Sequence, residues 1–126
     1  MNALDLCESP IETLLGEALL ARIGDDPLLS LQPQKALGPY RVDFVLVCSH
    51  DWGCCFVIEC DGHDFHERTR EQAQRDRRRD RFFSPRGWIV MRFTGSEIWR
   101  DAARCADEVF DVIEDHKETW RQESGR

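Results

Sequence analysis

The stretch FVIECDGHDFHERTREQAQRDRRRDRFF, residues 56–83, decides the fold of this 126-residue chain. It begins as an apolar strand, passes through acids and two histidines, and continues as a highly charged helix. After the stop signal SPRG, the segment GWIVMRF at 87–93 has the pattern of a second buried strand. A strand, helix and strand of this length predict a parallel crossover within one sheet.

The flanking segments complete the predicted architecture. The expected elements are, in order, helix 9–23, strand 28–35, strand 40–49, strand 54–60, helix 66–83, strand 87–93 and a final helix from residue 94. Ser9 and Glu12 form a predicted capping box, and the final helix is expected to break near Asp101. We therefore predict an α/β fold, with a mixed β-sheet in the order helix-strand-strand-strand-helix-strand-helix, flanked by helices on both faces.

The chain shows no internal repeat and no linker, so we expect one domain over 1–126. Its core spans about 9–118, and the polar tail after Trp120 is expected to fray. No apolar run approaches the roughly 20 residues of a membrane span. The first 15 residues have none of the features of an export signal, so a cytoplasmic protein without a membrane partner is the expectation.

The six cysteines fit the same compartment. In a reducing cytosol they are expected to be free thiols. The alternative is a zinc site made of Cys54, Cys55, Cys60 and His63, although this spacing matches none of the usual structural-zinc patterns.

The charge balance limits how the chain can meet nucleic acid. A formal net charge of -7 and a pI near 5.0 argue against binding by bulk electrostatics, so any phosphate contact must be local. One dense basic cluster exists, in the charged helix: Arg75, Arg77, Arg78, Arg79 and Arg81. The plain alternative is a solvated helix face with alternating charges.

Acids in apolar strands are the strongest chemical signal. Asp43 lies inside a strand, and Glu59 and Asp61 end the next one. Burying a carboxylate costs several kcal/mol unless a cation or donors compensate. A divalent cation such as Mg²⁺ would explain them, with the Cys60 carbonyl as a further ligand. The alternative is that Arg41 or Arg92 simply pairs with these acids.

The charged helix carries one polar side, which is predicted to face the acids: His66, Thr69, Gln72, Asp76 and Arg79. His66 begins this stripe and is the preferred candidate for general acid or base, or for positioning water, ahead of His63. The alternative is a helix held mostly by its ends, with its arginines in solvent.

Five blocks of the sequence occur in the order of a known nuclease group: SPIE, YRVDF, FVIECDGHDFH, TREQAQRDRRRDR and GWIVMRFTGSEI. Between residue 9 and about 101 the chain resembles the small stand-alone endonuclease domains of the PD-(D/E)XK superfamily. The most similar group is related to very-short-patch repair endonucleases, and much of it is still called domain of unknown function. The resemblance implies a restriction-endonuclease-like fold and hydrolysis of a phosphodiester by a metal-activated water.

The resemblance also implies site residues. Asp43 matches the first metal-binding aspartate, Glu59 the acid of the E-x-K motif, and Glu12 an acid of the first helix that often completes the site. The motif lysine falls at position 61, where this chain has Asp61. An aspartate followed by glycine and histidine is usual in the resembling group. Orienting water or neutralising the transition state would then pass to one of four candidates: His66, Gln72, Arg79 or Arg92.

We therefore predict a DNA endonuclease that depends on Mg²⁺ or Mn²⁺. Its predicted catalytic set is Glu12, Asp43, Glu59, Asp61, His66 and Gln72; its metal ligands are Asp43, Glu59 and Cys60; and its nucleic-acid contacts are Arg75, Arg78, Arg79 and Arg92. A homodimer or a larger repair or defence assembly could add contact area. The alternative is a catalytically inactive module of nuclease fold that binds DNA or a protein partner.

Overall fold

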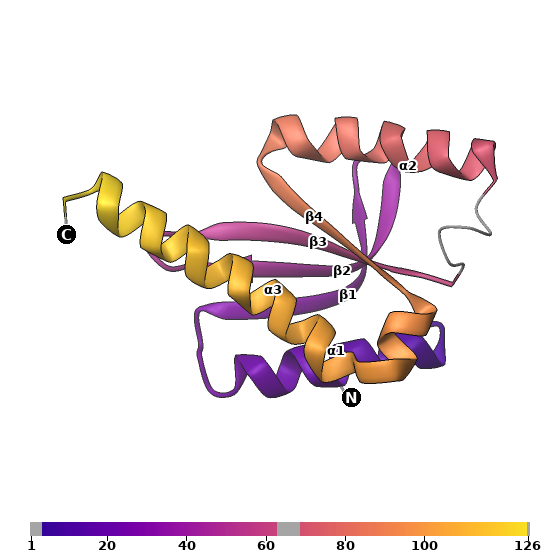
Figure 1. Cartoon of the computed structure of the whole chain (residues 1–126), viewed down its shortest axis with the longest axis horizontal. Helices are drawn as coiled ribbons and strands as arrows, with labels where there is room; N and C mark the ends of the chain where they lie inside the picture. The colour runs from indigo at the N-terminus through magenta and orange to yellow at the C-terminus, as the bar shows by residue number, and fades with distance from the viewer. Residues whose placement is uncertain (1–3, 63–68, 126) are drawn as a thin grey trace.

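The computed structural model describes residues 4–62 and 69–125. The elements are α1 (Pro10–Ile23), β1 (Leu29–Leu37), β2 (Tyr40–Cys48), β3 (Cys54–Asp61), α2 (Arg70–Phe83), the short 3-10 helix η2 (Ser84–Arg86), β4 (Trp88–Thr94) and α3 (Gly95–Glu123). The strands that are described form one sheet in the order β1-β2-β3-β4. β4 runs parallel to β3, and the other neighbouring pairs are antiparallel. The predicted element order and mixed sheet are confirmed (Figure 1).

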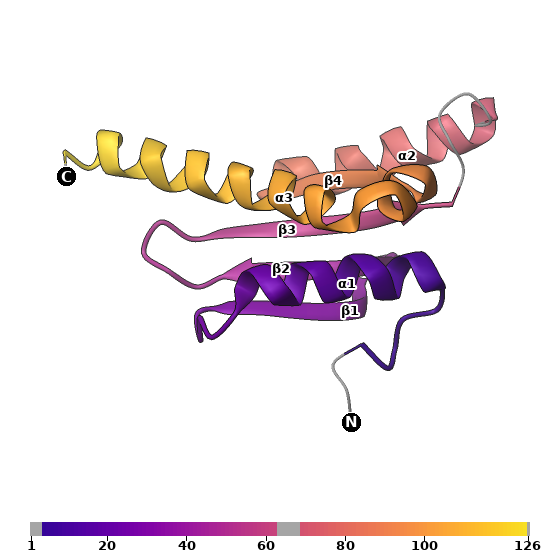
Figure 2. The same cartoon turned by 60° about the horizontal axis from the view of Figure 1, so that its bottom comes forward.

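Helices cover both faces of the sheet, as predicted (Figures 1 and 2). α1 and α3 pack against each other on one face, over a buried cluster that includes Phe44, Phe56 and Ile58. α2 lies on the opposite face, where Phe83 meets a smaller cluster with Val45 and Val57. The two central strands are therefore buried from both sides, which explains their nearly continuous apolar runs.

Asp43 lies where β2 departs from regular alternation. Val42 and Val45 both pack in the cluster beneath α2, although residues three apart on a regular strand point to opposite faces. Phe44 packs on the other side, in the cluster beneath α1 and α3. The slip between Val42 and Val45 turns the Asp43 side chain toward the neighbouring strand, where it accepts a hydrogen bond from the Cys60 backbone N–H.

The predicted capping box of α1 is half right. The Ser9 hydroxyl accepts a hydrogen bond from the Glu12 N–H at 3.3 Å, as expected of an N-cap. The Glu12 carboxylate does not return to Ser9. It accepts from the Glu8 N–H at 3.0 Å and from the Gln34 amide at 2.7 Å, so its side chain is turned toward the sheet.

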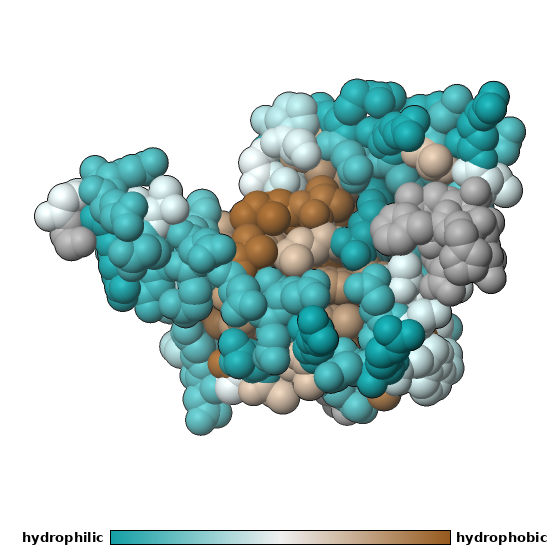
Figure 3. Space-filling model, viewed as in Figure 1, coloured by the Kyte–Doolittle hydropathy of each residue, from teal (hydrophilic) through white to brown (hydrophobic). Residues whose placement is uncertain are grey.

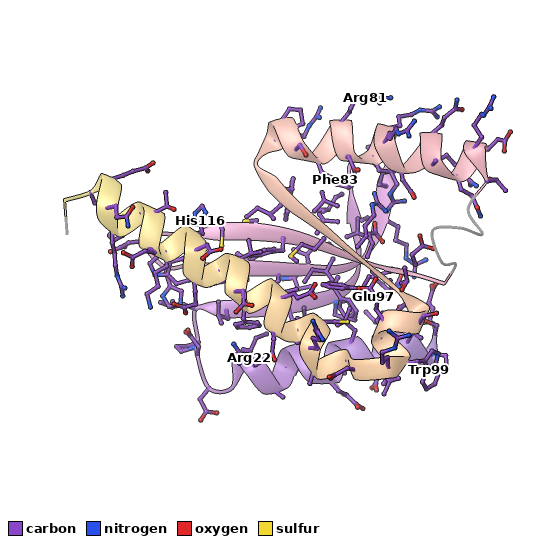
Figure 4. All side chains as sticks on the ribbon, in the orientation of Figure 1. Arg22, Arg81, Phe83, Glu97, Trp99 and His116 are labelled. Carbon is purple, nitrogen blue, oxygen red and sulfur yellow. The ribbon has the colours of Figure 1, made fainter. Side chains whose placement is uncertain are left out.

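α2 begins later than predicted. Thr69 is its N-cap, with extended backbone angles, and Gln72 completes a capping box there. The helix therefore starts at Arg70, immediately after its cap. His66, where the prediction placed its start, lies outside the described residues. Figure 4 shows Phe83 directed toward the sheet and Arg81 directed away from it. Phe83 is the buried residue of this helix.

The other end of α2 is fitted to the β1–β2 turn. Gly38 has φ +58°, and a Cβ added there would lie 2.5 Å from the Phe82 ring. The turn therefore requires glycine for both backbone and space.

β4 forms the edge of the sheet, and Figure 3 shows hydrophobic surface over it, between α2 and α3.

α3 is bent at Asp101, where the backbone is extended (φ -165°, ψ 85°), as the sequence predicted. Asp101 caps the second segment by accepting from the Arg104 N–H at 3.1 Å. α3 continues past Trp120 to Glu123, so the first three residues of the predicted tail are helical. His116 helps to hold this segment through the Gly53 carbonyl, at 3.1 Å.

Within residues 4–62 and 69–125, no helix has the length and apolar character to cross a membrane.

Candidate active site

Three carboxylates from three elements meet at one end of the sheet. Glu12 comes from the first turn of α1, Asp43 from β2 and Glu59 from β3. The Gln34 amide donates to Glu12 Oε2 at 2.7 Å and to Asp43 Oδ1 at 3.5 Å, and Glu59 Oε2 lies 3.4 Å from the Asp43 backbone nitrogen. Glu12 and Glu59 are buried, with exposed fractions of 7% and 8%. The structure thus brings together the three acids that the resemblance singled out.

Asp43 is the acid of this cluster whose ionisation is most strongly opposed by its surroundings. Its Oδ2 accepts a 2.7 Å hydrogen bond from the Cys60 N–H, which favours the ionised form. Burial opposes ionisation more strongly, and the carboxylates of Glu59 and Glu12 add repulsion, so the pKa of Asp43 is raised to about 7. A cation beside Asp43 would relieve both effects.

Gln34 is a site residue that the sequence analysis missed. Its backbone has φ +52°, in the left-handed region that non-glycine residues seldom adopt. Such backbone conformations persist where the surroundings fix them, and they cluster at functional sites. This conformation places the side-chain amide between two carboxylates. Nothing in the local sequence LQPQKAL signals this role, because it depends on the pairing of β1 with β2 and on the position of α1.

Next to the acids lies a pocket of about 380 Å³ between β3 and α2. Its lining residues are Tyr40, Glu59, Cys60, Asp61, Gly62, Gln72, Arg75, Asp76, Arg78, Arg79 and Arg92. Eight of these were predicted site residues, so the polar side of α2 does face Glu59. Tyr40 was not predicted. Its ring lies under the Arg79 guanidinium at 5.1 Å from carbon to ring centre.

The pocket arginines differ in what they contact. Arg79 pairs with Glu59 and also donates to the Arg41 carbonyl at 3.1 Å. Arg92 is held by Asp80 at 2.8 Å and by Asp76 at 3.5 Å. The cation that pairs with Glu59 is therefore Arg79, and not Arg41 or Arg92 as the alternative supposed, because Arg41 pairs with Glu8.

Arg75 and Arg78 are exposed, and neither forms an ion pair with any acid among residues 4–62 and 69–125. Gln72 also lines the pocket, but its side-chain oxygen accepts from the Thr69 N–H at 2.8 Å as part of the cap. Arg75 and Arg78 are therefore the pocket groups best placed to receive an external anion.

The thiol and the backbone carbonyl of Cys60 differ in their suitability as metal ligands. Its thiol packs against the core beneath α1 and α3, while Glu59 turns toward α2. Burial first, and then the charges of Asp43, Glu12 and Glu59, raise the pKa of the Cys60 thiol well above its ordinary value. A thiol that stays protonated is a poor metal ligand, so only the backbone carbonyl of Cys60 suits the predicted role.

The histidines divide by position. His50 lies in the β2–β3 turn, at the opposite end of these strands from the acids, and contacts Asp26. His116 lies on α3 and contacts the Gly53 carbonyl of the same turn. His63 and His66 lie outside the described residues. His63 is the histidine of the zinc alternative. Cys54 and Cys55 are successive strand residues whose side chains point to opposite faces.

The donor set suits a hard divalent cation better than zinc. Across the described ranges, no group of three or more His, Cys, Asp and Glu side chains is arranged to hold a metal ion. Mg²⁺ needs fewer, because it is commonly bound by one or two carboxylates and keeps several waters. Asp43 and Glu59 supply two such carboxylates from neighbouring strands, and the Cys60 carbonyl follows Glu59 directly in the chain.

The charges are segregated by face. α2 carries six arginines against three acids, whereas α3 carries nine acids against four lysines and arginines. Because α2 and α3 lie on opposite faces of the sheet (Figure 1), the basic surface lies beside the pocket and the acidic surface away from it. The acidic pI of the whole chain therefore does not describe the pocket.

A four-stranded mixed sheet with helices on both faces is consistent with a restriction-endonuclease-like fold. The family model REase_MTES_1575 matches residues 19–113, and the chain belongs to this restriction endonuclease-like family. The matched region contains Asp43, Glu59 and all of α2, whereas Glu12 precedes it. A comparison with curated proteins gives no significant match.

Proposed function

We propose that the protein is a metal-dependent DNA endonuclease of the PD-(D/E)XK type, similar to the very-short-patch repair group. The observation that carries the proposal is the juxtaposition of the Glu12, Asp43 and Glu59 acid cluster with an arginine-lined pocket. Repelling acids favour a bound cation, and the exposed arginines of the pocket favour a phosphate. Family membership supports nuclease chemistry over other uses of this geometry.

Asp43 and Glu59 would hold Mg²⁺ or Mn²⁺ together with the Cys60 carbonyl. The chemistry that the ion supplies when bound is activation of water and stabilisation of charge on the phosphodiester. Glu12 acts through Gln34, which fixes the Asp43 carboxylate from the side of α1. Asp61 and Gln72 border the pocket, and His66 stays a proposed proton-transfer group.

The experiment is incubation of supercoiled plasmid and of short duplexes with the purified protein and Mg²⁺, Mn²⁺, Ca²⁺ or EDTA. Nicked or linear DNA is expected with Mg²⁺ or Mn²⁺ and not with EDTA. Intact DNA under every metal, with a folded protein, would reject the nuclease.

A second candidate is a module of the same fold that binds DNA or a protein without cleaving it. The ion pair between Arg79 and Glu59 favours it, because it occupies a proposed metal ligand. DNA binding without cleavage, together with no metal binding in calorimetry, would establish this alternative.

Arg75 and Arg78 are proposed to bind phosphates of the DNA strand. The double variant Arg75→Gln/Arg78→Gln is expected to weaken binding and to reduce the slope of log affinity against log salt by about 2. Fluorescence anisotropy between low and moderate salt, in Ca²⁺, measures this. Arg81→Gln, on the side of α2 away from the sheet (Figure 4), should leave the slope unchanged. An equal effect of Arg81→Gln would mean that the whole helix charge, not the pocket, attracts DNA.

A pocket of this volume reaches only a short length of strand. We therefore propose that the protein acts in the cytoplasm as a homodimer or within a larger repair or defence assembly, because specific DNA interfaces bury a larger surface than one such pocket provides.

A further inference from the structure

Arg79 occupies an unusual position between the helix and the acid cluster. Its guanidinium contacts Glu59, the Arg41 carbonyl and the face of the Tyr40 ring. Its side chain is 23% exposed, and that of Glu59 is 10% exposed, so water screens this pair only partly. The Arg79 Nε–H is buried and has no hydrogen-bond partner among residues 4–62 and 69–125.

A buried, unpaired donor costs free energy, so the arrangement around Arg79 is incompletely satisfied. The guanidinium has five donors in a planar fork, which matches two oxygens of a phosphate better than one carboxylate oxygen and one carbonyl. Arg79 also lines the pocket, so a phosphate that enters would come within reach of it.

The other pocket cations are excluded from this position. Arg92 is held by two aspartates of α2. Arg75 and Arg78 are exposed and contact no acid in the described part of the chain. Position 61 holds an aspartate, so β3 itself places no cation beside Glu59 on that side.

We propose that Arg79 is an exchangeable counter-ion: it neutralises Glu59 while the metal is absent, and it turns to the scissile phosphate once a divalent cation takes Glu59. This inference rests on the proposed function and deepens it, because it assigns to α2 the positive charge that position 61 lacks. Arg79 then neutralises Glu59 before the metal binds and the phosphate afterwards, so Glu59 has a cationic partner in both states.

If Arg79 exchanges between Glu59 and the phosphate, its removal should change metal affinity and turnover in opposite directions. Removing the guanidinium removes a competitor for Glu59, so metal affinity should rise. It also removes the phosphate contact, so turnover should fall. A structural ion pair would give loss of both, and a simple phosphate contact would leave metal affinity unchanged.

The test is calorimetric titration of Arg79→Gln and wild-type protein with Mn²⁺ in the absence of DNA. The variant is expected to bind Mn²⁺ about tenfold more tightly. At saturating Mn²⁺, its kcat for a short duplex should fall about 100-fold or more, with a smaller change in KM. Arg79→Lys keeps the charge and should retain near-wild-type Mn²⁺ affinity. Arg78→Gln, one position away in the same pocket, should not alter Mn²⁺ affinity.

A second measurement uses the wild-type protein, and variants serve only to assign its NMR signals. In NMR spectra of the arginine Nε–H groups, saturating Ca²⁺ should shift the Arg79 signal of the wild-type protein and leave that of Arg92 in place. Unchanged or weaker Mn²⁺ binding by Arg79→Gln, or an Arg79 signal indifferent to Ca²⁺, would overturn the exchange. If wild-type protein fails to cleave DNA, the proposed function fails, while both binding measurements still decide whether Arg79 yields Glu59 to a metal.

Discussion

Replacing Asp43 by asparagine is expected to abolish DNA cleavage and, at the same time, to make the metal-free protein more stable at pH 8. The loss of cleavage should be about 10³-fold or more, because the variant lacks a proposed metal ligand. The gain in stability follows from the strained position of Asp43. An amide of the same shape can keep the hydrogen bond from the Cys60 N–H without carrying charge.

The sign of the pH dependence follows from the raised pKa. In the unfolded chain Asp43 ionises near 3.8, whereas in the folded protein its pKa is about 7. The folded state therefore binds the proton more tightly, and this contribution to stability is complete below pH 3.8 and lost as the pH rises through 7. The amide of the Asp43→Asn variant cannot ionise, so the advantage of the variant should grow from pH 5 to pH 8 and reach about 2 kcal/mol.

Urea unfolding at pH 5 and pH 8, without metal, measures this difference. Asp111→Asn, at an exposed acid of α3, is the control and should show no such pH dependence. Equal destabilisation of Asp43→Asn at both pH values would mean that the carboxylate is satisfied within the protein and that the cluster has no need of a cation.

The Phe83→Ala variant is expected to lose about 3–5 kcal/mol of the free energy of unfolding. Phe83 has no exposed surface, and its ring lies 5.7 Å from that of Tyr40 and 5.1 Å from that of Phe82. It is the buried residue of α2, which is also tied to the sheet by the ion pairs of Arg79 and Arg92 and by contacts of Arg79 and Phe82 with Tyr40. Because domains commonly have only about 5–15 kcal/mol of stability in total, α2 should become poorly held.

Chemical denaturation measures the loss, and DNA affinity measured where the variant is still folded reports the placement of the pocket arginines. Phe82→Ala is the matched control, since Phe82 is half-buried and packs on the β1–β2 turn, and its loss should be less than half as large. A small effect at Phe83 would show that the charged contacts, not the aromatic anchor, hold α2.

Much of the fold was predictable because it depends on local patterns. The N-cap at Ser9 and the break at Asp101 are each encoded within a few residues, and the crossover from β3 through α2 to β4 follows from successive local patterns. The sequence pattern places the start of α2 too early, because Thr69 and Gln72 also fit a polar helical stripe, whereas in the structure they form the capping box of the helix.

By itself, the sequence determined the order of the elements, the burial of β2 and β3, and the presence of acids at strand positions where a carboxylate needs a partner. Only the tertiary structure decided which partner each acid has: Gln34 between Glu12 and Asp43, and Arg79 on Glu59. The physical reason is distance along the chain. Hydrophobic period and caps act over one or two turns, whereas these contacts join residues 9 to 22 positions apart and exist only once the sheet and both helix layers have assembled.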